Sequence, residues 1–505
     1  MFNQIFKFEL AFHARQPLVH VVSGVLFLLS FGAIVSDNIS IGGTITNINI
    51  NSPFNVIVML DTISFLASMV AGVAFASSPI LRDFDHQVAE LFFTTRVSKF
   101  NYLFGRFCGA MLFCFVVYFA AAFGVLLGEF MPWIDPERLG PLRLDAYWFA
   151  TWAIAIPNTI LVGSMVFLVA TLTRSLLASY VVLISVLVLQ ATVASLVDPD
   201  DIQLLSLLDP FGQTAVLELT RYWTPFEMNE LVVPMEGNLL YNRYIAVGLI
   251  AIFMTLAYRF FPFSMAFGTN QGWLAKWRAR RKATKSKQDL APPVTSSGQV
   301  VRKFDLSSQA QQMWSLLRIE FYNIIMGKAF LVLALLGMLQ VIISALFGLS
   351  SMFGTDVYPT TSALVFIING SYTLPMVAVM IFYSSELLVR ERNVQISEML
   401  DSMPHPNWAI ISAKLVALMS VLAVMLLAVI LGGILVQVGT GFYDIDIFQY
   451  LFGLFAFFQY PVWFTCVLAV FAQVITGNRY LGMFVMVLYF VVSVSYTHLT
   501  LPTKA

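Results

Sequence analysis

The sequence predicts an all-α fold: a polytopic helical membrane protein built from two tandem six-span repeats, the second one truncated. The composition indicates a membrane protein, because 59% of the 505 residues are apolar and only 11% are charged, which is more apolar than a soluble core requires. Ten complete apolar runs of about 20 residues follow one another, and a run of this length forms a helix that crosses a bilayer. A repeat is indicated by the stretch 81–106, which returns 308 positions later without a gap.

The apolar runs define the expected spans. They cover 18–36, 55–81, 107–130, 147–173, 175–197 and 244–263 in the first half, and 329–349, 364–388, 415–438 and 450–475 in the second, before a partial run from Tyr480. The first run is too long, and begins too far from the N-terminus, for a cleaved signal peptide, so it is expected to remain as a span. Pro157 and Pro461 lie at matching places in spans four and ten and are expected to kink both helices.

Each copy of the repeated stretch predicts one short amphipathic helix at the membrane surface. The matched positions keep charge or size: Arg82 with Arg390, Asp83 with Glu391, Gln87 with Gln395, Glu90 with Glu398, and Arg106 with Lys414. The apolar side of each helix is expected to pack on the ends of the spans; it is formed by Val88, Leu91 and Phe92 in the first copy and by Ile396, Met399 and Leu400 in the second. The repeat extends to residues 7–10 (KFEL) with 318–321 (RIEF), and to 157–167 with 461–471.

The distribution of Lys and Arg predicts the orientation. With the N-terminus in the cytoplasm and Lys504 of the tail set aside, only Arg138, Arg143, Arg221 and Arg243 lie outside, which satisfies the positive-inside rule. The segments 37–54, 131–146 and 198–243 are then external, and 82–106, 264–328 and 389–414 are cytoplasmic. The predicted location is the bacterial inner membrane, with the lipid bilayer as the surrounding partner.

The predicted domains follow from the repeat. Residues 1–269 form the first unit, 270–312 form a basic and then Pro/Ser-rich cytoplasmic linker, and 313–493 form the second unit, which is cut short in its eleventh span. The tail 494–505 resembles the translation of a sequencing adapter, so the natural sequence is expected to continue beyond Ser493.

Several kinds of chemistry have no motif in this sequence. It contains neither a G-x-x-x-x-G-K-[ST] phosphate loop nor an H-E-x-x-H metal motif, and no metal site or nucleic-acid partner is expected. Cys108, Cys114 and Cys466 lie in apolar runs and are expected to be buried thiols. Asp61 and Glu386 lie near the ends of spans and are expected at the membrane interface.

The external segment 198–243 is rich in apolar and aromatic residues, which indicates a packed re-entrant or interfacial hairpin. An alternative is a substrate gate. Its residues would be Asp209, Pro210, Phe211 and Gly212.

The cytoplasmic motifs resemble those of the permease subunits of type-2 ABC exporters. The resemblance rests on the entry segment 7–9 (KFE), on a span that ends in 81–83 (LRD), and on 90–92 (ELF), 94–95 (TT), 98–99 (SK) and 103–106 (LFGR). It covers residues 1–493. The external motifs 208–212 (LDPFG) and 222–224 (YWT) are similar to those of a subgroup in which two permease units precede a zinc aminopeptidase-like domain.

The resemblance implies a permease that is not itself an enzyme and carries no cofactor. A separate cytoplasmic ABC ATPase dimer, with ATP and Mg²⁺ bound to it, would contact the short helices and drive the spans. The implied coupling residues are Arg82, Asp83, Gln87, Glu90, Leu91, Phe92, Arg390, Glu391, Gln395, Glu398, Met399 and Leu400. Pro404 and Pro406 replace Arg96 and Ser98 in the second copy, so the two contacts are not expected to be equivalent.

Two other functions fit the same composition. A secondary transporter would require charge pairs within the membrane. A membrane anchor for a C-terminal peptidase-like domain would require no pathway. Neither half carries a pocket signature that separates lipid, peptide, ion and drug substrates.

Overall fold

A computed structural model describes residues 1–36, 48–86, 88–195, 202–261, 305–348, 357–393, 397–402 and 406–497. Within these ranges every regular element is a helix. Eight helices are long and apolar enough to cross a membrane, or nine if the bent pair Ile447–Phe457 and Tyr460–Thr476 is one span. The chain is therefore an all-α, multi-pass membrane protein, as the composition predicts.

The helices follow the order of the predicted spans. The elements of the first half are α1 (Phe2–Ala14), α2 (Pro17–Val35), α3 (Pro53–Ala71), η1 (Gly72–Ala76), α4 (Ser78–Asp85), α5 (Ala89–Thr94), α6 (Lys99–Gly128), η2 (Pro136–Arg138), α7 (Leu144–Phe149), η3 (Ala150–Ala155), α8 (Ile156–Thr173), α9 (Leu176–Ser195), α10 (Ile202–Leu208), α11 (Gln213–Thr220), α12 (Pro225–Glu230) and α13 (Gly237–Phe260). Those of the second half are α15 (Leu306–Ile325), α16 (Lys328–Gly348), α17 (Thr361–Asn393), α18 (Ser397–Asp401), α19 (Asn407–Gly439), α20 (Ile447–Leu451), η6 (Phe452–Phe458), α21 (Tyr460–Thr476) and α22 (Arg479–Thr497). The predicted fifth and eleventh runs form α9 and α22, which carry shorter apolar stretches over Leu176–Gln190 and Arg479–Phe490.

Spans four and ten share an irregularity at their prolines. In each, a π-helical segment precedes the helix whose first turn contains Pro157 or Pro461: η3 directly, and η6 with one residue between. Proline removes a backbone donor and crowds the preceding turn, and a π turn absorbs the mismatch. In the second half the two parts of the span meet at 41°. In the first half α7, η3 and α8 continue as one span, Leu144–Thr173.

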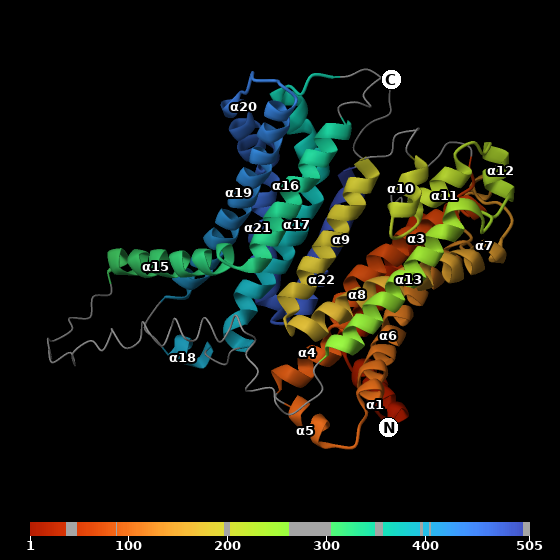
Figure 1. Cartoon of the computed structure of the whole chain (residues 1–505), viewed down its shortest axis with the longest axis horizontal. Helices are drawn as coiled ribbons and strands as arrows, with labels where there is room; N and C mark the ends of the chain where they lie inside the picture. The colour runs from red at the N-terminus through yellow and green to blue at the C-terminus, as the bar shows by residue number, and fades with distance from the viewer. Residues whose placement is uncertain are drawn as a thin grey trace.

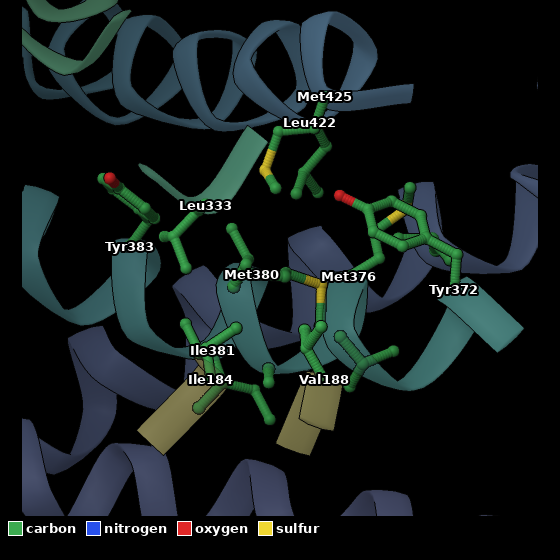
Figure 2. Close-up of a cluster of buried hydrophobic side chains, with 14 of the residues drawn as sticks. Ile184, Val188, Leu333, Tyr372, Met376, Met380, Ile381, Tyr383, Leu422 and Met425 are labelled. Carbon is green, nitrogen blue, oxygen red and sulfur yellow. The ribbon is translucent and has the colours of Figure 1, made fainter. Parts of the chain in front are cut away.

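The two halves lie side by side and are joined by α9 (Figure 1). This helix belongs to the first half by sequence, yet it packs against α16 and α17 of the second half. Figure 2 shows Ile184 and Val188 of α9 close to Met380 and Ile381 of α17 in one buried cluster. Tyr180 of α9 also stacks on Phe382 of α17, with ring centroids 4.5 Å apart. Where α9 meets α17, the boundary between the halves is therefore apolar and closely packed.

Short elements gather at the two ends of the bundle. In Figure 1, α1, α4 and α5 lie at the lower end of the first half, while α7, α10, α11 and α12 lie at its upper end. In the second half α15 runs across the direction of the spans and packs through Leu317 on Ala413 and Ala417 of α19. The segments with predicted cytoplasmic positions therefore share one end of their half, and the described parts of the predicted external segments share the other.

Candidate functional site

The candidate site lies where α1 meets the ends of α4 and α6. Gly105 and Gly109 are one turn apart on α6 and allow α1 to approach closely. A Cβ atom added to Gly109 would lie 2.5 Å from Cβ of Glu9, and one added to Gly105 would lie 3.0 Å from Ile5. The sequence thus places the carboxylate of Glu9 against α6, in a position where it is completely buried.

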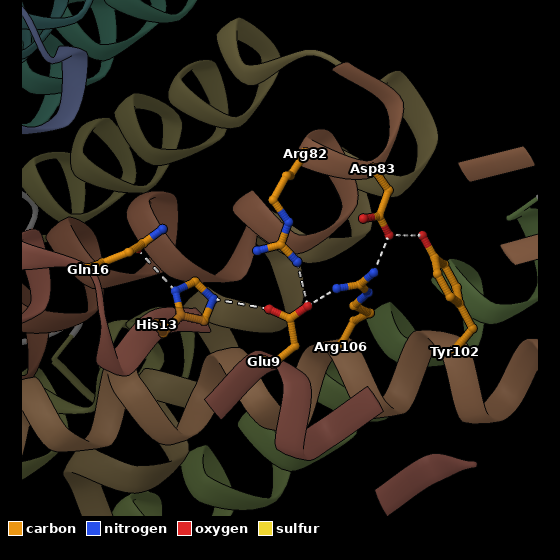
Figure 3. Close-up of polar contacts among 7 residues, drawn as sticks. All are labelled: Glu9, His13, Gln16, Arg82, Asp83, Tyr102 and Arg106. Atoms are coloured by element: carbon orange, nitrogen blue, oxygen red, sulfur yellow. Dashed lines mark hydrogen bonds and ion pairs between the residues drawn. The ribbon is translucent and has the colours of Figure 1, made fainter. Parts of the chain in front are cut away.

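Glu9 joins two arginines from different elements (Figure 3). Its Oε1 accepts a hydrogen bond from Arg82 Nη2 at 2.6 Å and another from Arg106 Nη1. Arg106 Nη2 donates to Asp83 Oδ2 at 2.7 Å, and the Tyr102 hydroxyl donates to the same oxygen at 2.7 Å. Two carboxylates thus face two guanidinium groups, and this balance of charge is what makes their burial tolerable. We call Glu9, Arg82, Asp83, Tyr102 and Arg106 the first charge cluster.

Aromatic rings cover both guanidinium groups. Arg82 lies over the ring of Phe12, with Cζ 3.9 Å from the centroid, and Arg106 lies 5.1 Å from the ring of Phe92. Such cation–π contacts are stronger where water is excluded. Because Phe92 belongs to α5, this contact connects the short surface helix directly to the cluster.

His13 borders the cluster one turn along α1 from Glu9. Its Nε2 lies 3.4 Å from Glu9 Oε2, and its Nδ1 lies 3.3 Å from Gln16 Oε1. Burial lowers the pKa of His13 from 6.5 to about 4, with the bond to Gln16 opposing the change and the charge of Arg82 adding to it. The imidazole is therefore neutral at physiological pH.

Equivalent residues of the second half form a second charge cluster. Arg390 Nη1 lies 3.7 Å from Glu320 Oε2, and Lys414 Nζ lies 2.8 Å from Glu391 Oε2. These pairs match Arg82 with Glu9 and Arg106 with Asp83 in the first cluster. Lys414 has no forked head to reach two carboxylates, and the Arg390 side chain is 47% exposed. Burial raises the pKa of Glu320, while Lys414 and Arg390 act to lower it. The second cluster is therefore less tightly connected, and more exposed to solvent, than the first.

The short helices α5 and α18 present an outward apolar residue each. Leu91 is 66% exposed and Met399 is 65% exposed, and these residues are 308 positions apart. The expectation that both would pack on the spans is wrong, because these two side chains lie on the exposed side of their helices. Phe92 and Leu400 are half-buried, as expected of the packed side.

The structure describes the remaining predicted coupling residues only in part. Gln87 and Gln395 lie outside the described residues, as does Ile396. Of Glu90 and Glu398 the structure describes the helical backbone alone, in α5 and α18 respectively. Arg82 and Asp83 therefore pair with residues of α1 and α6. Arg390 and Glu391 pair with residues of α15 and α19. The sequence did not predict these partners.

At the opposite end of the first half, the predicted gate residues form a buried turn between α10 and α11. Asp209 Oδ1 accepts from the backbone N–H of Phe211 at 2.9 Å, and its Oδ2 accepts from that of Thr214 at 2.7 Å. Gly212 has a φ of 83°, and a Cβ atom there would lie 2.2 Å from Arg243 Nη2. The turn is held by its own backbone and by Arg243, which fits the packed hairpin better than a movable gate.

Asp61 belongs to the same buried region. Asn158 Nδ2 donates to Asp61 Oδ1 at 3.0 Å and to the carbonyl oxygen of Phe211 at 3.1 Å, and Arg243 Nη1 donates to Asn158 Oδ1 at 2.9 Å. Asp61 was expected near the outer membrane interface; the structure buries its side chain between α3 and α8, next to the turn that contains Phe211. The sequence did not predict its partner Asn158, or the link through Asn158 to Arg243.

A cavity of about 370 Å³ lies between the two halves. Its walls come from α2, α3 with η1, and α9 on one side, and from α17 and α22 on the other. The lining side chains are almost all aliphatic or aromatic.

Comparisons of the chain with protein-family models, with curated proteins and with solved structures found no match. Within the described ranges, no three His, Cys, Asp or Glu side chains are grouped so that they could hold a metal ion. The charge clusters, the exposed short helices and the cavity are therefore the features that bear on function.

Proposed function

We propose that this chain is the transmembrane permease component of an ATP-binding-cassette exporter. In this proposal it forms the substrate pathway and couples to a separate cytoplasmic ATPase, which binds ATP and Mg²⁺. The chain comprises two permease units in tandem, and the side that carries α1, α5 and α18 faces the cytoplasm.

One observation carries the proposal. Leu91 and Met399 occupy matching positions on two short helices and are exposed to nearly the same extent, 66% and 65%. A single exposed apolar side chain needs no partner, but exposure that recurs at the matching position of the second half fits a contact that both copies make. Two matching contacts fit a partner that itself has two copies, and the ATPase dimer implied by the resemblance is such a partner.

The charge clusters supply a route by which a push on these helices would reach the spans. Phe92 of α5 contacts Arg106 of α6, and Arg106 shares Glu9 with Arg82 at the end of span two. Movement of α5 would therefore displace the ends of α4 and α6 together with α1, rather than one helix alone. The same arrangement in the second half supports the tandem repeat, because Arg390 and Lys414 form ion pairs with carboxylates at matching positions.

The proposal is tested by making both contacts polar. The double variant Leu91→Asp with Met399→Asp should lose co-purification with the ATPase and lose transport-stimulated ATP hydrolysis, because each change puts a charge into an apolar contact. Leu204→Asp is the matched control, since Leu204 is 61% exposed on α10 at the other end of the bundle. A double variant that binds and stimulates the ATPase as wild type does would contradict the proposal.

Glu90→Ala with Glu398→Ala probes the same surface. We expect normal insertion and stability, and weaker ATPase binding, because truncating one side of a buried charged contact costs about 2–5 kcal/mol. Glu90→Ala alone should do more harm than Glu398→Ala alone, since Pro404 and Pro406 alter the second copy.

A secondary transporter is the second candidate, and one observation favours it. Asp61 and Arg243 lie in one buried network through Asn158, and ionisable groups within membrane-spanning segments are often functional. None of these residues lines the cavity between the halves, which is why we rank this function second. Transport that persists without ATP and is lost in Asp61→Asn would favour it.

A further inference from the structure

The residues that line the cavity between the halves indicate which kind of ligand it could bind. No charged side chain lines it, and among the lining residues only Ser30, Thr62 and Tyr480 carry a hydroxyl group. Leu26, Leu66, Leu187, Ile381 and Phe484 are typical of the rest. Its volume of about 370 Å³ falls within the range of about 300–1,000 Å³ found for small-molecule sites.

The hydroxyl groups of Ser30 and Thr62 are engaged within their own helices. Ser30 Oγ donates to the carbonyl oxygen of Leu26 at 2.7 Å, and Thr62 Oγ1 donates to that of Val58 at 2.9 Å. A hydroxyl proton that is given to its own helix is not available to a ligand. An ion, a sugar or a charged peptide would therefore lose its hydration in this cavity and find almost no replacement.

The cavity is long in the direction of the spans. Its lining runs from Thr62 to Ala74 along α3 and η1, and from Leu18 to Ser30 along α2. Each of these segments corresponds to about 18 Å at 1.5 Å per residue. One leaflet of a bilayer whose hydrocarbon core is about 30 Å thick accounts for about 15 Å of lipid chain. The cavity thus has the length and the apolar walls that suit one extended lipid chain.

We propose that this cavity binds one hydrocarbon chain of a lipid-like amphiphile, and that such an amphiphile is the substrate class of the exporter. The second half of this statement rests on the proposed function; the first does not. The polar head of the molecule stays outside the cavity, where water or lipid head groups solvate it. Both halves of the protein contribute walls, so a relative movement of the halves would change their contacts with the bound hydrocarbon chain.

The probe for this site is a palmitate analogue with a diazirine at the end of its alkyl chain. The protein is placed in phosphatidylcholine nanodiscs with the probe and illuminated, and labelled peptides are identified by mass spectrometry. We expect labels on the segments around Leu66 of α3 and Met483 of α22. A water-soluble sugar with the same diazirine should not label these segments.

Two variants fill the cavity from different helices. Ala378→Trp and Leu66→Trp should each reduce labelling about tenfold or more, the loss expected when an apolar pocket no longer accepts part of its ligand. Ala251→Trp is the matched control, because Ala251 is exposed on α13, and it should label as wild type does. Circular dichroism and thermal unfolding show which variants keep the fold, and the use of two positions keeps the test valid if one variant does not.

The outcomes separate the two halves of the proposal. Unchanged labelling in both folded variants, or labelling by the sugar probe, overturns the chain-binding site whether or not an ATPase couples. With the ATPase present, ATP turnover should reduce labelling of the cavity, as expected of a substrate that leaves. Labelling that is unaffected by turnover in a coupled complex would identify a resident bilayer lipid and overturn the substrate class.

Discussion

Removing the carboxylate of Glu9 should unbalance the first charge cluster. In Glu9→Gln the guanidinium groups of Arg82 and Arg106 remain buried with one carboxylate, that of Asp83, between them. Loss of one partner from a buried ion pair typically costs about 3–5 kcal/mol, and both arginines are mostly or fully buried. We therefore expect the free energy of unfolding to fall by about that amount.

The second cluster supplies the internal control. Glu320→Gln removes the matching carboxylate, but Arg390 is 47% exposed and lies 3.7 Å away, and pairs of this kind contribute about 0–1 kcal/mol. Unfolding of the detergent-solubilised protein in increasing SDS, followed by tryptophan fluorescence, measures both changes. Equal losses in the two variants would show that Glu9 stabilises the fold no more than its counterpart does, and would refute the reasoning.

Three further predictions follow from other residues. The pKa of His13 is about 4 in the folded state and 6.5 in the unfolded chain. The neutral imidazole therefore stabilises the fold fully above pH 6.5, and this contribution, on the order of 3 kcal/mol, is lost as the pH falls to about 4. A His13→Gln variant should show a flatter pH dependence of the free energy of unfolding, and an unchanged slope would contradict this. Gly212→Ala should cost about 2 kcal/mol or more in thermal unfolding, because an L-residue at this positive φ is strained and its methyl group would meet Arg243; wild-type stability would exclude that clash. A cysteine at position 285 should not react with an impermeant thiol reagent outside intact cells, and reaction there would reverse the predicted orientation.

The apolar runs predicted the spans well because bilayer thickness imposes a length on them. The predicted run 18–36 is helix α2, Pro17–Val35, for example. The ends were less predictable where a helix continues beyond the membrane. Helix α6 starts at Lys99, ahead of the predicted 107, because Ser98 caps it by accepting from the backbone N–H of Asn101 at 3.2 Å. Hydropathy does not register such a cap.

The site was predicted in part. The repeat singled out Arg82 and Asp83, and it also showed that Glu9 and Arg106 recur with their charges kept, yet it did not pair them. Pairing across 97 residues, as between Glu9 and Arg106, depends on how helices pack. The recurrence of opposite charges at a fixed offset was the available signal. Leu91 was placed on the wrong side because a helix of six residues, Ala89–Thr94, is too short for its periodicity to define a face.

The position of α9 has a consequence for how the protein is made. Helix α9 leaves the ribosome well before α16 and α17, against which it finally packs. Until those helices are inserted, Ile184 and Val188 must face lipid or a temporary neighbour. In the first half synthesised alone, α9 would keep its contact with α8 but lack α16 and α17. Separately expressed halves should therefore assemble through α9. Biogenesis of this chain is expected to be completed only after the second half has entered the bilayer.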